Sequence, residues 1–225
     1  MTEAVVVAGE DVRAPRLGRW WQLSLGIICM SMIANLQYGW TLFVNPIHDK
    51  YQWGLPAIQV AFTVFVVVET WLVPFEGFLV DLIGPKMVGV FSGLLVAGSW
   101  IIYSVADSLP MLYLGAVVGG IGAGGVYGAC VGNALKWFPD RRGLAAGLTA
   151  MGFGAGSALT VFPIASMIRS EGYEATFLKF GIAQGTVVFL VGFLLRAPDK
   201  KFKAPVKLGA VPAVESREYT PTQVL

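Results

Sequence analysis

Six long apolar stretches, separated by short polar breaks, constrain this chain more than any other feature of its 225 residues. Each is long enough to cross the hydrocarbon core of a bilayer as a helix, which takes roughly 20 residues. Open strands would leave backbone polar groups unpaired in lipid, so helices are expected throughout. The sequence therefore predicts an all-α membrane protein with six transmembrane helices. The expected spans are 20–44, 57–80, 87–106, 111–135, 144–168 and 175–195.

Composition agrees with a lipid environment. Only 13% of the residues are charged, against about a quarter in a soluble domain. The net charge of +2 gives no indication of nucleic-acid binding. With His48 as the one histidine, and Cys29 and Cys130 inside apolar stretches, we expect no metal site and no disulfide. No motif of a soluble enzyme occurs, so no catalytic residue and no cofactor are predicted.

The distribution of Lys and Arg predicts the orientation of the bundle. Of the 16 basic residues, 13 fall on the side of the N-terminus and three on the other side, namely Lys50, Arg169 and Lys179. Basic loops stay on the cytoplasmic side, so both ends of the chain are predicted to be cytoplasmic, in the cell inner membrane. Residues 1–19 form a cytoplasmic segment, 20–196 the bundle, and 197–225 a cytoplasmic linker. The linker ends where a seventh helix would begin.

Two carboxyl side chains interrupt the second span. Glu69 lies near its middle, and Glu76 lies seven residues later on the same helical face. A charge within the membrane marks either a functional site or a buried pair. Glu69 is therefore a candidate for proton coupling, with a structural hydrogen bond as the alternative. Glu76, nearer the cytoplasmic end, is expected to pair with a loop cation, and Pro74 to kink the helix.

Three further polar side chains lie near mid-membrane: Gln37 and Tyr38 in the first span and Tyr127 in the fourth. Each either binds a small solute in a cavity or forms a hydrogen bond to a neighbouring helix. Tyr-Gly followed by Asn occurs in both spans, as expected of two three-helix units in inverted topology. Glycines at every fourth position, from Gly120 to Gly132, predict close helix packing by the fourth span.

The loop after the second span has a distinctive motif. It reads Gly77-Phe-Leu-Val-Asp81-Leu-Ile-Gly84-Pro85-Lys86. This resembles the cytoplasmic signature of the major facilitator superfamily, with Leu82 in place of the usual basic residue. The resemblance implies that Asp81 and Lys86 belong to a gating latch, in which the Asp meets a cation and a helix end. Arg141 and Arg142, in the loop after the fourth span, are assigned to the same gate.

Within that superfamily, three stretches resemble the oxalate:formate antiporter group. They begin at Gln37, at Val126 and at Trp137, and the last reads Trp137-Phe-Pro-Asp140-Arg-Arg-Gly143-Leu-Ala. The resemblance implies the N-terminal six-helix half of a twelve-helix carrier, built from 3+3 inverted repeats around a central cavity. The missing C-terminal half would supply the basic residues that bind substrate.

The same resemblance implies a set of cavity residues. Gln37, Tyr38 and Tyr127 match substrate-contacting positions of the group, and Phe153 stands where the group has a Tyr. The lost hydroxyl, together with Glu69, fits a related monocarboxylate carrier better than an oxalate carrier. We expect a secondary transporter of small organic anions that works by alternating access, by antiport or by proton symport. The alternative is a six-helix scaffold or sensor that moves no solute.

Overall fold

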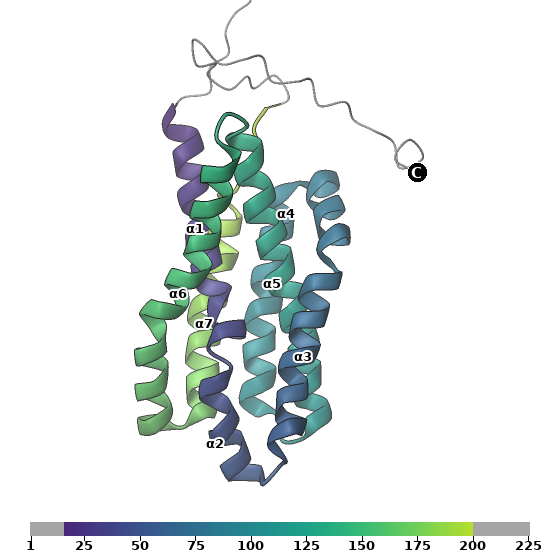
Figure 1. The fold of residues 1–225 in the computed structure, drawn as a ribbon, viewed down its shortest axis with the longest axis vertical. Helices are drawn as coiled ribbons and strands as arrows, with labels where there is room; N and C mark the ends of the chain where they lie inside the picture. Colours follow the sequence, from purple (N-terminus) through teal and green to yellow (C-terminus); the bar gives the residue numbers. More distant parts are fainter. Residues whose placement is uncertain (1–15, 200–225) are drawn as a thin grey trace, which may run out of the picture.

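The computed structural model describes residues 16–199, and within that range every regular element is a helix. Figure 1 shows a bundle whose helices run mostly along its long axis. The segments predicted as termini, 1–19 and 197–225, lie largely outside the described residues. The helices are α1 (Arg16–Tyr38), α2 (Thr41–Tyr51), α3 (Leu55–Trp71), α4 (Val73–Val105), α5 (Leu109–Trp137), α6 (Arg142–Glu171) and α7 (Tyr173–Gly192).

Four of these helices are long and apolar enough to cross a membrane singly: α4, α5, α6 and α7. The pair α1 and α2 qualifies as a fifth span, bent by 41° at the break between the helices. The 17-residue helix α3 is apolar but short for a span of its own. The predicted second span is therefore shared between α3 and the beginning of α4.

Helix α4 consists of two helices that meet at Gly84, where φ is +85°. Phe65 lies against Gly120 of α5, Glu76 lies against Gly124, and Asp81 pairs with Lys136. The contacts advance in the same direction along both chains, so α3 and the first part of α4 run parallel to α5. Beyond Gly84 the order reverses: Ser92 lies against Gly125, whereas Tyr103 lies against the earlier Gly115. The chain thus turns back at Gly84, a conformation that favours glycine.

The remaining contacts complete an alternating arrangement. Gln22 and Gly26 of α1 lie against Asn133 and Cys130, respectively, so α1 runs antiparallel to α5. Gly185 and Gly192 of α7 lie against Ala97 and Val90, respectively, so α7 runs antiparallel to the second part of α4. Gly152 of α6 lies against Ile27 of α1, and Gly156 lies against Ser31, so α6 runs parallel to α1. Six segments therefore alternate in direction, which agrees with the predicted six-helix fold.

The break in the first span is not where the sequence analysis placed it. The first span was expected to end at residue 44, before Asn45-Pro46, but Pro46 lies inside α2 and the chain bends at Gly39 and Trp40 instead. A Cβ on residue 39 would lie 2.7 Å from the carbonyl oxygen of Asn35, so the tight bend requires glycine. Thr41 to Tyr51 then continue as one helix that includes the charged residues expected in a loop.

The second span is interrupted near the expected proline. Helix α3 ends at Trp71 and α4 begins at Val73, with Pro74 in its first turn. Proline has no backbone N–H to donate to residue 70, so the helical hydrogen-bond ladder is incomplete there. Glu69 and Glu76 consequently lie on two helices that meet at Leu72, and not on one continuous face.

Glycines on α5 allow helices on two sides to approach closely. Gly120 and Gly124 face α3 and the beginning of α4, as their four-residue spacing predicted, whereas Gly132 has open space beside it. A second row that includes Gly119 and Gly122 faces the later part of α4. Helix α5 is therefore packed between the two arms of the turn at Gly84.

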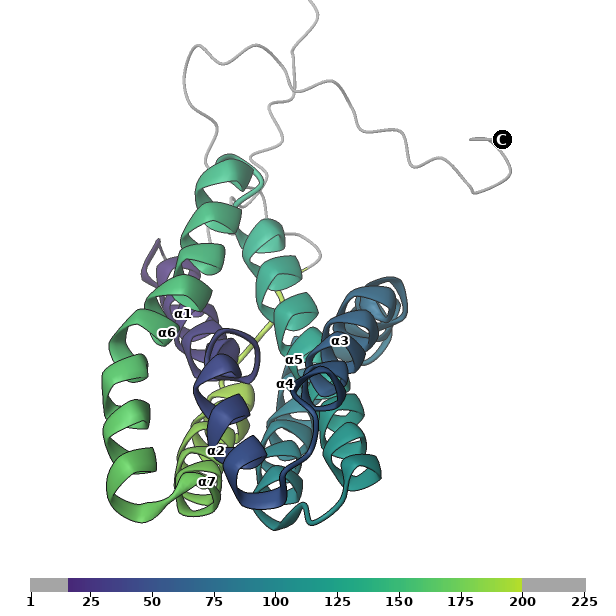
Figure 2. The ribbon, with the colours of Figure 1, turned by 60° about the horizontal axis from the view of Figure 1, so that its bottom comes forward.

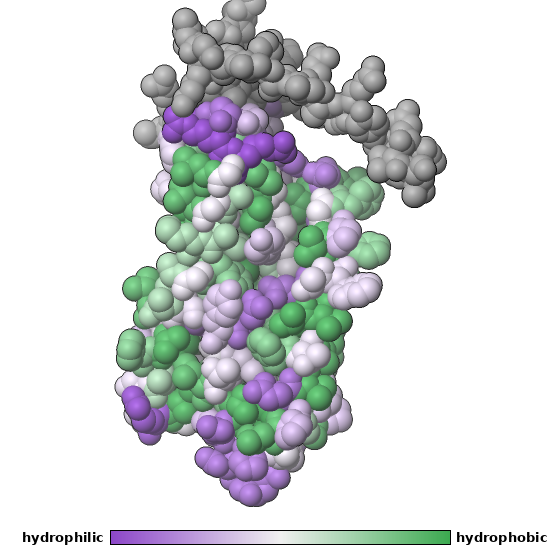
Figure 3. All heavy atoms as spheres, in the orientation of Figure 1, coloured by the Kyte–Doolittle hydropathy of each residue, from purple (hydrophilic) through white to green (hydrophobic). Residues whose placement is uncertain are grey.

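The surface has the pattern expected of a membrane protein. Figure 3 shows hydrophilic residues at the two ends of the bundle and mainly apolar residues on the flank between them. Large apolar side chains are strongly exposed, among them Trp71, Phe75, Leu159 and Phe162. Cys29 and Cys130 are buried as free thiols.

Candidate functional site

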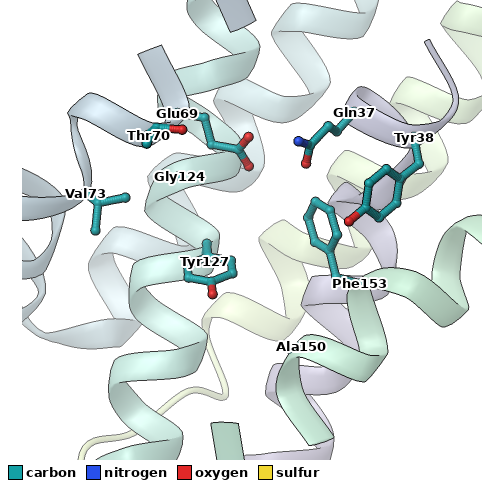
Figure 4. Close-up of a pocket in the computed structure, with 9 residues that line it drawn as sticks. All are labelled: Gln37, Tyr38, Glu69, Thr70, Val73, Gly124, Tyr127, Ala150 and Phe153. Carbon is teal, nitrogen blue, oxygen red and sulfur yellow. The ribbon is translucent and has the colours of Figure 1, made fainter. Parts of the chain in front are cut away.

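A cavity of about 320 Å³ lies between the helices, and we call it the central cavity. It takes side chains from α1, α3, α4, α5 and α6, so residues up to 116 positions apart in the chain meet there (Figure 4). All five residues predicted to bind substrate or protons are among those that line it. The lining residues are Gln37, Tyr38, Glu69, Thr70, Val73, Gly124, Tyr127, Ala150 and Phe153.

The broken first span places two of these side chains. Gln37 and Tyr38 form the last turn of α1, just before the bend at Gly39 and Trp40. The Tyr38 ring packs edge-on against Phe153 of α6, with 5.1 Å between ring centroids. Because Phe153 is only 8% exposed, it provides a fixed apolar support for Tyr38. One wall of the central cavity is therefore made by α1 and α6.

The opposite wall carries a carboxyl group. Glu69 comes from the last turn of α3, and in Figure 4 its carboxyl group points across the cavity toward the Gln37 amide. Tyr127 of α5 lies on the same side of the cavity as Glu69, below it in the view. None of the four polar side chains Gln37, Tyr38, Glu69 and Tyr127 has a hydrogen bond within residues 16–199. The alternative of hydrogen bonds between helices is thus not seen for any of them.

Unpaired polar groups facing a shared space can bind a polar solute. An amide and two phenol hydroxyls donate hydrogen bonds, and a carboxyl group accepts them or carries a proton. No Lys or Arg lines the cavity within the described residues. Thr70, from the same helical turn as Glu69, adds a hydroxyl that the sequence analysis did not identify. Its position next to Glu69 would have been a usable signal.

A second cavity of about 490 Å³ lies toward the end of the bundle that holds Asp81, and we call it the Asp81 cavity. Lys136 Nζ, at the end of α5, donates a hydrogen bond of 2.6 Å to Asp81 Oδ1. Arg142 lines the same cavity from the start of α6. The structure thus brings together Asp81 and Arg142 of the predicted gate, and it adds Lys136 as the partner cation.

The other two predicted gate residues lie elsewhere. Lys86 Nζ lies 5.5 Å from the centroid of the Phe193 ring, and Arg141 Nε lies 3.8 Å from Asp140. The same Asp140 accepts hydrogen bonds of 3.0 and 3.3 Å from the guanidinium group of Arg19. This ion pair ties the start of α1 to the loop before α6, and the sequence analysis missed it.

Glu76 does not pair with a loop cation, contrary to expectation. It is 7% exposed, and neither carboxyl oxygen has a hydrogen-bond partner within residues 16–199. Its carboxyl group lies against Gly124, where an added Cβ would be 2.5 Å from Oε2. The prediction failed because the available cation, Lys136, pairs with the exposed Asp81 instead.

Within residues 16–199, no group of three or more His, Cys, Asp or Glu side chains is arranged to hold a metal ion.

Comparison with known proteins gives a consistent family. Residues 23–224 match the family described as Major Facilitator Superfamily. The oxalate:formate antiporter of Oxalobacter formigenes is 38% identical over 183 residues, which are 81% of this chain and 44% of the relative. The MFS-type transporter YhjX of Escherichia coli is 30% identical over 188 residues, covering 81% of this chain and 46% of the relative.

A more distant similarity connects the chain with animal proteins. Monocarboxylate transporter 9 of Gallus gallus is 33% identical over 114 residues, or 50% of this chain and 22% of the relative. The chain thus spans less than half the length of these curated relatives.

Proposed function

This chain belongs to the major facilitator superfamily, a family of transporters, and from that premise we propose that it is the N-terminal half of a carrier for small organic anions. The carrier would be a secondary active transporter that works by alternating access. The observation that supports this best is the central cavity, where Gln37, Tyr38, Glu69, Tyr127 and Phe153 meet from four helices.

The cavity is incomplete within this chain. Tyr38 is 52% exposed and Tyr127 is 38% exposed, although both line it. Figure 2 shows α6 on one flank and α3 on the other, with α1 and α5 between them. A second six-helix half placed against this face would close the cavity and supply the cation for an anionic substrate. The relatives' greater length is consistent with such a half.

The anion class follows from the relatives and from the lining. The relative from Oxalobacter formigenes is named for oxalate and formate, and the one from Gallus gallus is named for monocarboxylates. An ionised Glu69 would repel any anion, and a dianion about twice as strongly as a monoanion, whereas a protonated Glu69 would donate a hydrogen bond to a carboxylate. We therefore favour a monocarboxylate such as formate or lactate. Exchange for a second anion and symport with a proton both remain compatible with this lining.

The location and the gate are part of the proposal. Both chain ends would be cytoplasmic in the cell inner membrane, with the Asp81 cavity on the cytoplasmic side, because most basic residues belong to that end. The Asp81–Lys136 ion pair would hold the cytoplasmic ends of α4 and α5 together in one state of the transport cycle. Its release would accompany opening toward the cytoplasm.

The test is anion uptake by the twelve-helix protein in proteoliposomes, with variants of the cavity. Gln37→Ala and Tyr127→Phe each remove one donor, and a hydrogen bond to a charged group contributes about 1.5–3 kcal/mol. Each variant is expected to raise KM by at least about tenfold. Gln59→Ala, at an exposed position of α3 remote from the cavity lining, is the matched control and should leave KM unchanged. Unchanged KM in both cavity variants would refute the assignment.

A further inference from the structure

Glu76 is a buried carboxyl group that the proposed function does not use. It belongs to the first turn of α4, and its carboxyl group lies against α5 with both oxygens unpartnered. An ionised carboxylate without a partner is costly in the membrane interior, so a side chain at such a position binds a proton or a cation. A purely structural Glu would have a hydrogen-bond partner there.

The position of Glu76 between the two cavities gives it a route to both. Gly124, whose added Cβ would lie 2.5 and 2.6 Å from the two carboxyl oxygens, lines the central cavity. Gly77 and Gly128 line the Asp81 cavity, and an added Cβ at Gly128 would lie 3.7 Å from the Cβ of Glu76. The residues next to Glu76 thus border the central cavity on one side and the Asp81 cavity on the other.

We propose that Glu76 is a proton-binding site that passes protons between the Asp81 cavity and Glu69 in the central cavity. A hydronium ion in the Asp81 cavity gives its proton to the ionised Glu76 and becomes water. The new O–H bond on Glu76 then breaks as an oxygen of the ionised Glu69 gains the proton, which leaves Glu76 ionised again. The two residues are seven positions apart, on either side of the break at Leu72, so water in the central cavity would connect them. This inference rests on the proposed transport function.

The groups around Glu76 favour a proton over a metal ion. On α3 the ionisable neighbour is Glu69, and the contacting positions of α5 are the glycines 124 and 128. Helix α7 packs on the later part of α4, as at Gly192 against Val90, and brings no charge to Glu76. Lys136 is held by Asp81. Among the described residues, Glu76 belongs to no group of three or more His, Cys, Asp or Glu side chains that could hold a metal ion.

The first arm of the test asks whether Glu76 carries a proton, and it needs no transport. Infrared spectra of the reconstituted twelve-helix protein are recorded at neutral pH, where a protonated carboxyl group has its own carbonyl band. The band should be present in the wild type, lose the intensity of one carboxyl group in Glu76→Gln and keep its full intensity in Asp107→Asn, whose exposed carboxylate is the control. An unchanged intensity of this band in Glu76→Gln would overturn the proposal.

The second arm compares uptake driven by a pH gradient with anion exchange at equal pH. General acid–base steps contribute about 100-fold or more, so Glu76→Gln should slow gradient-driven uptake about 100-fold and leave exchange unchanged, with Glu76→Asp restoring part of the uptake. Equal loss of both activities would show a structural role and overturn the relay, as would gradient-independent uptake by the wild type. If the wild type moves no anion at all, the proposed function fails, and the infrared band still decides whether Glu76 binds a proton.

Discussion

Replacing Gly156 by Ala tests the packing that places the cavity residues of α1 and α6. A Cβ at this position would lie 2.1 Å from the carbonyl oxygen of Ser31, whereas ordinary contact begins at 3.4 Å. Backbone atoms cannot rotate away, so α1 must shift by about 1.3 Å. Overpacking of this kind costs about 1–3 kcal/mol, which exceeds the gain of up to about 1 kcal/mol from the better helix propensity of Ala. We therefore expect a net destabilisation of roughly 1–2 kcal/mol.

Two residues away, Gly154 provides the matched control, because nothing lies within 4 Å of its added Cβ. Reversible unfolding in mixed micelles would give the free energy of unfolding of the wild type, Gly156→Ala and Gly154→Ala. Gly154→Ala should be as stable as the wild type or slightly more stable. In the twelve-helix protein, Gly156→Ala should also raise KM, since the displaced α1 carries Gln37 and Tyr38. Equal stability of the two variants would refute the close contact between α1 and α6.

Three other perturbations probe the ends of the bundle. The Arg19–Asp140 ion pair has two hydrogen bonds, so a double-mutant cycle of Arg19→Met and Asp140→Asn should give a coupling of about 1–3 kcal/mol in the free energy of unfolding. Additive effects of the two substitutions would contradict this pairing. Asp81→Asn should change the free energy of unfolding by less than about 1 kcal/mol, because the carboxylate is exposed. It should nevertheless alter the rate of uptake, and an unchanged rate would argue against a gate. Gly84→Ala should cost about 1–2 kcal/mol in thermal unfolding from its positive φ alone, and no loss would contradict the turn.

The fold was predictable because lipid imposes strict requirements on length and hydrogen bonding. Six apolar stretches of about the bilayer thickness gave six helical segments that alternate in direction. The breaks were less predictable. Pro46 signalled a helix end, but a proline in the second turn of α2 removes only one hydrogen bond, and the actual bend depends on the contact between Gly39 and Asn35.

The cavity residues were predicted from polarity at mid-membrane together with the resemblance to a known family. Gln37, Tyr38, Glu69, Tyr127 and Phe153 line one cavity, and their roles in binding remain predictions. Sequence position gives depth along a helix, but it does not give the helix that each side chain faces.

The ion pairs were harder to predict, since a partner depends on which helices are neighbours. Lys136 was not assigned to Asp81, and Glu76 was expected to have a cation that the structure does not provide. Both errors arise from the turn at Gly84, which brings the start of α4 against α5 and leaves Glu76 facing Gly124.

The most direct test of the central proposal is uptake of radiolabelled formate, lactate and oxalate into proteoliposomes that hold the twelve-helix protein. Each anion is measured with and without an imposed pH gradient, and with Glu69→Gln in parallel. We predict uptake of a monocarboxylate above that of protein-free liposomes, driven by the gradient and lost in Glu69→Gln. Uptake that requires a counter-anion inside and ignores the gradient would contradict proton coupling. No uptake of any of the three anions would contradict the proposed function itself.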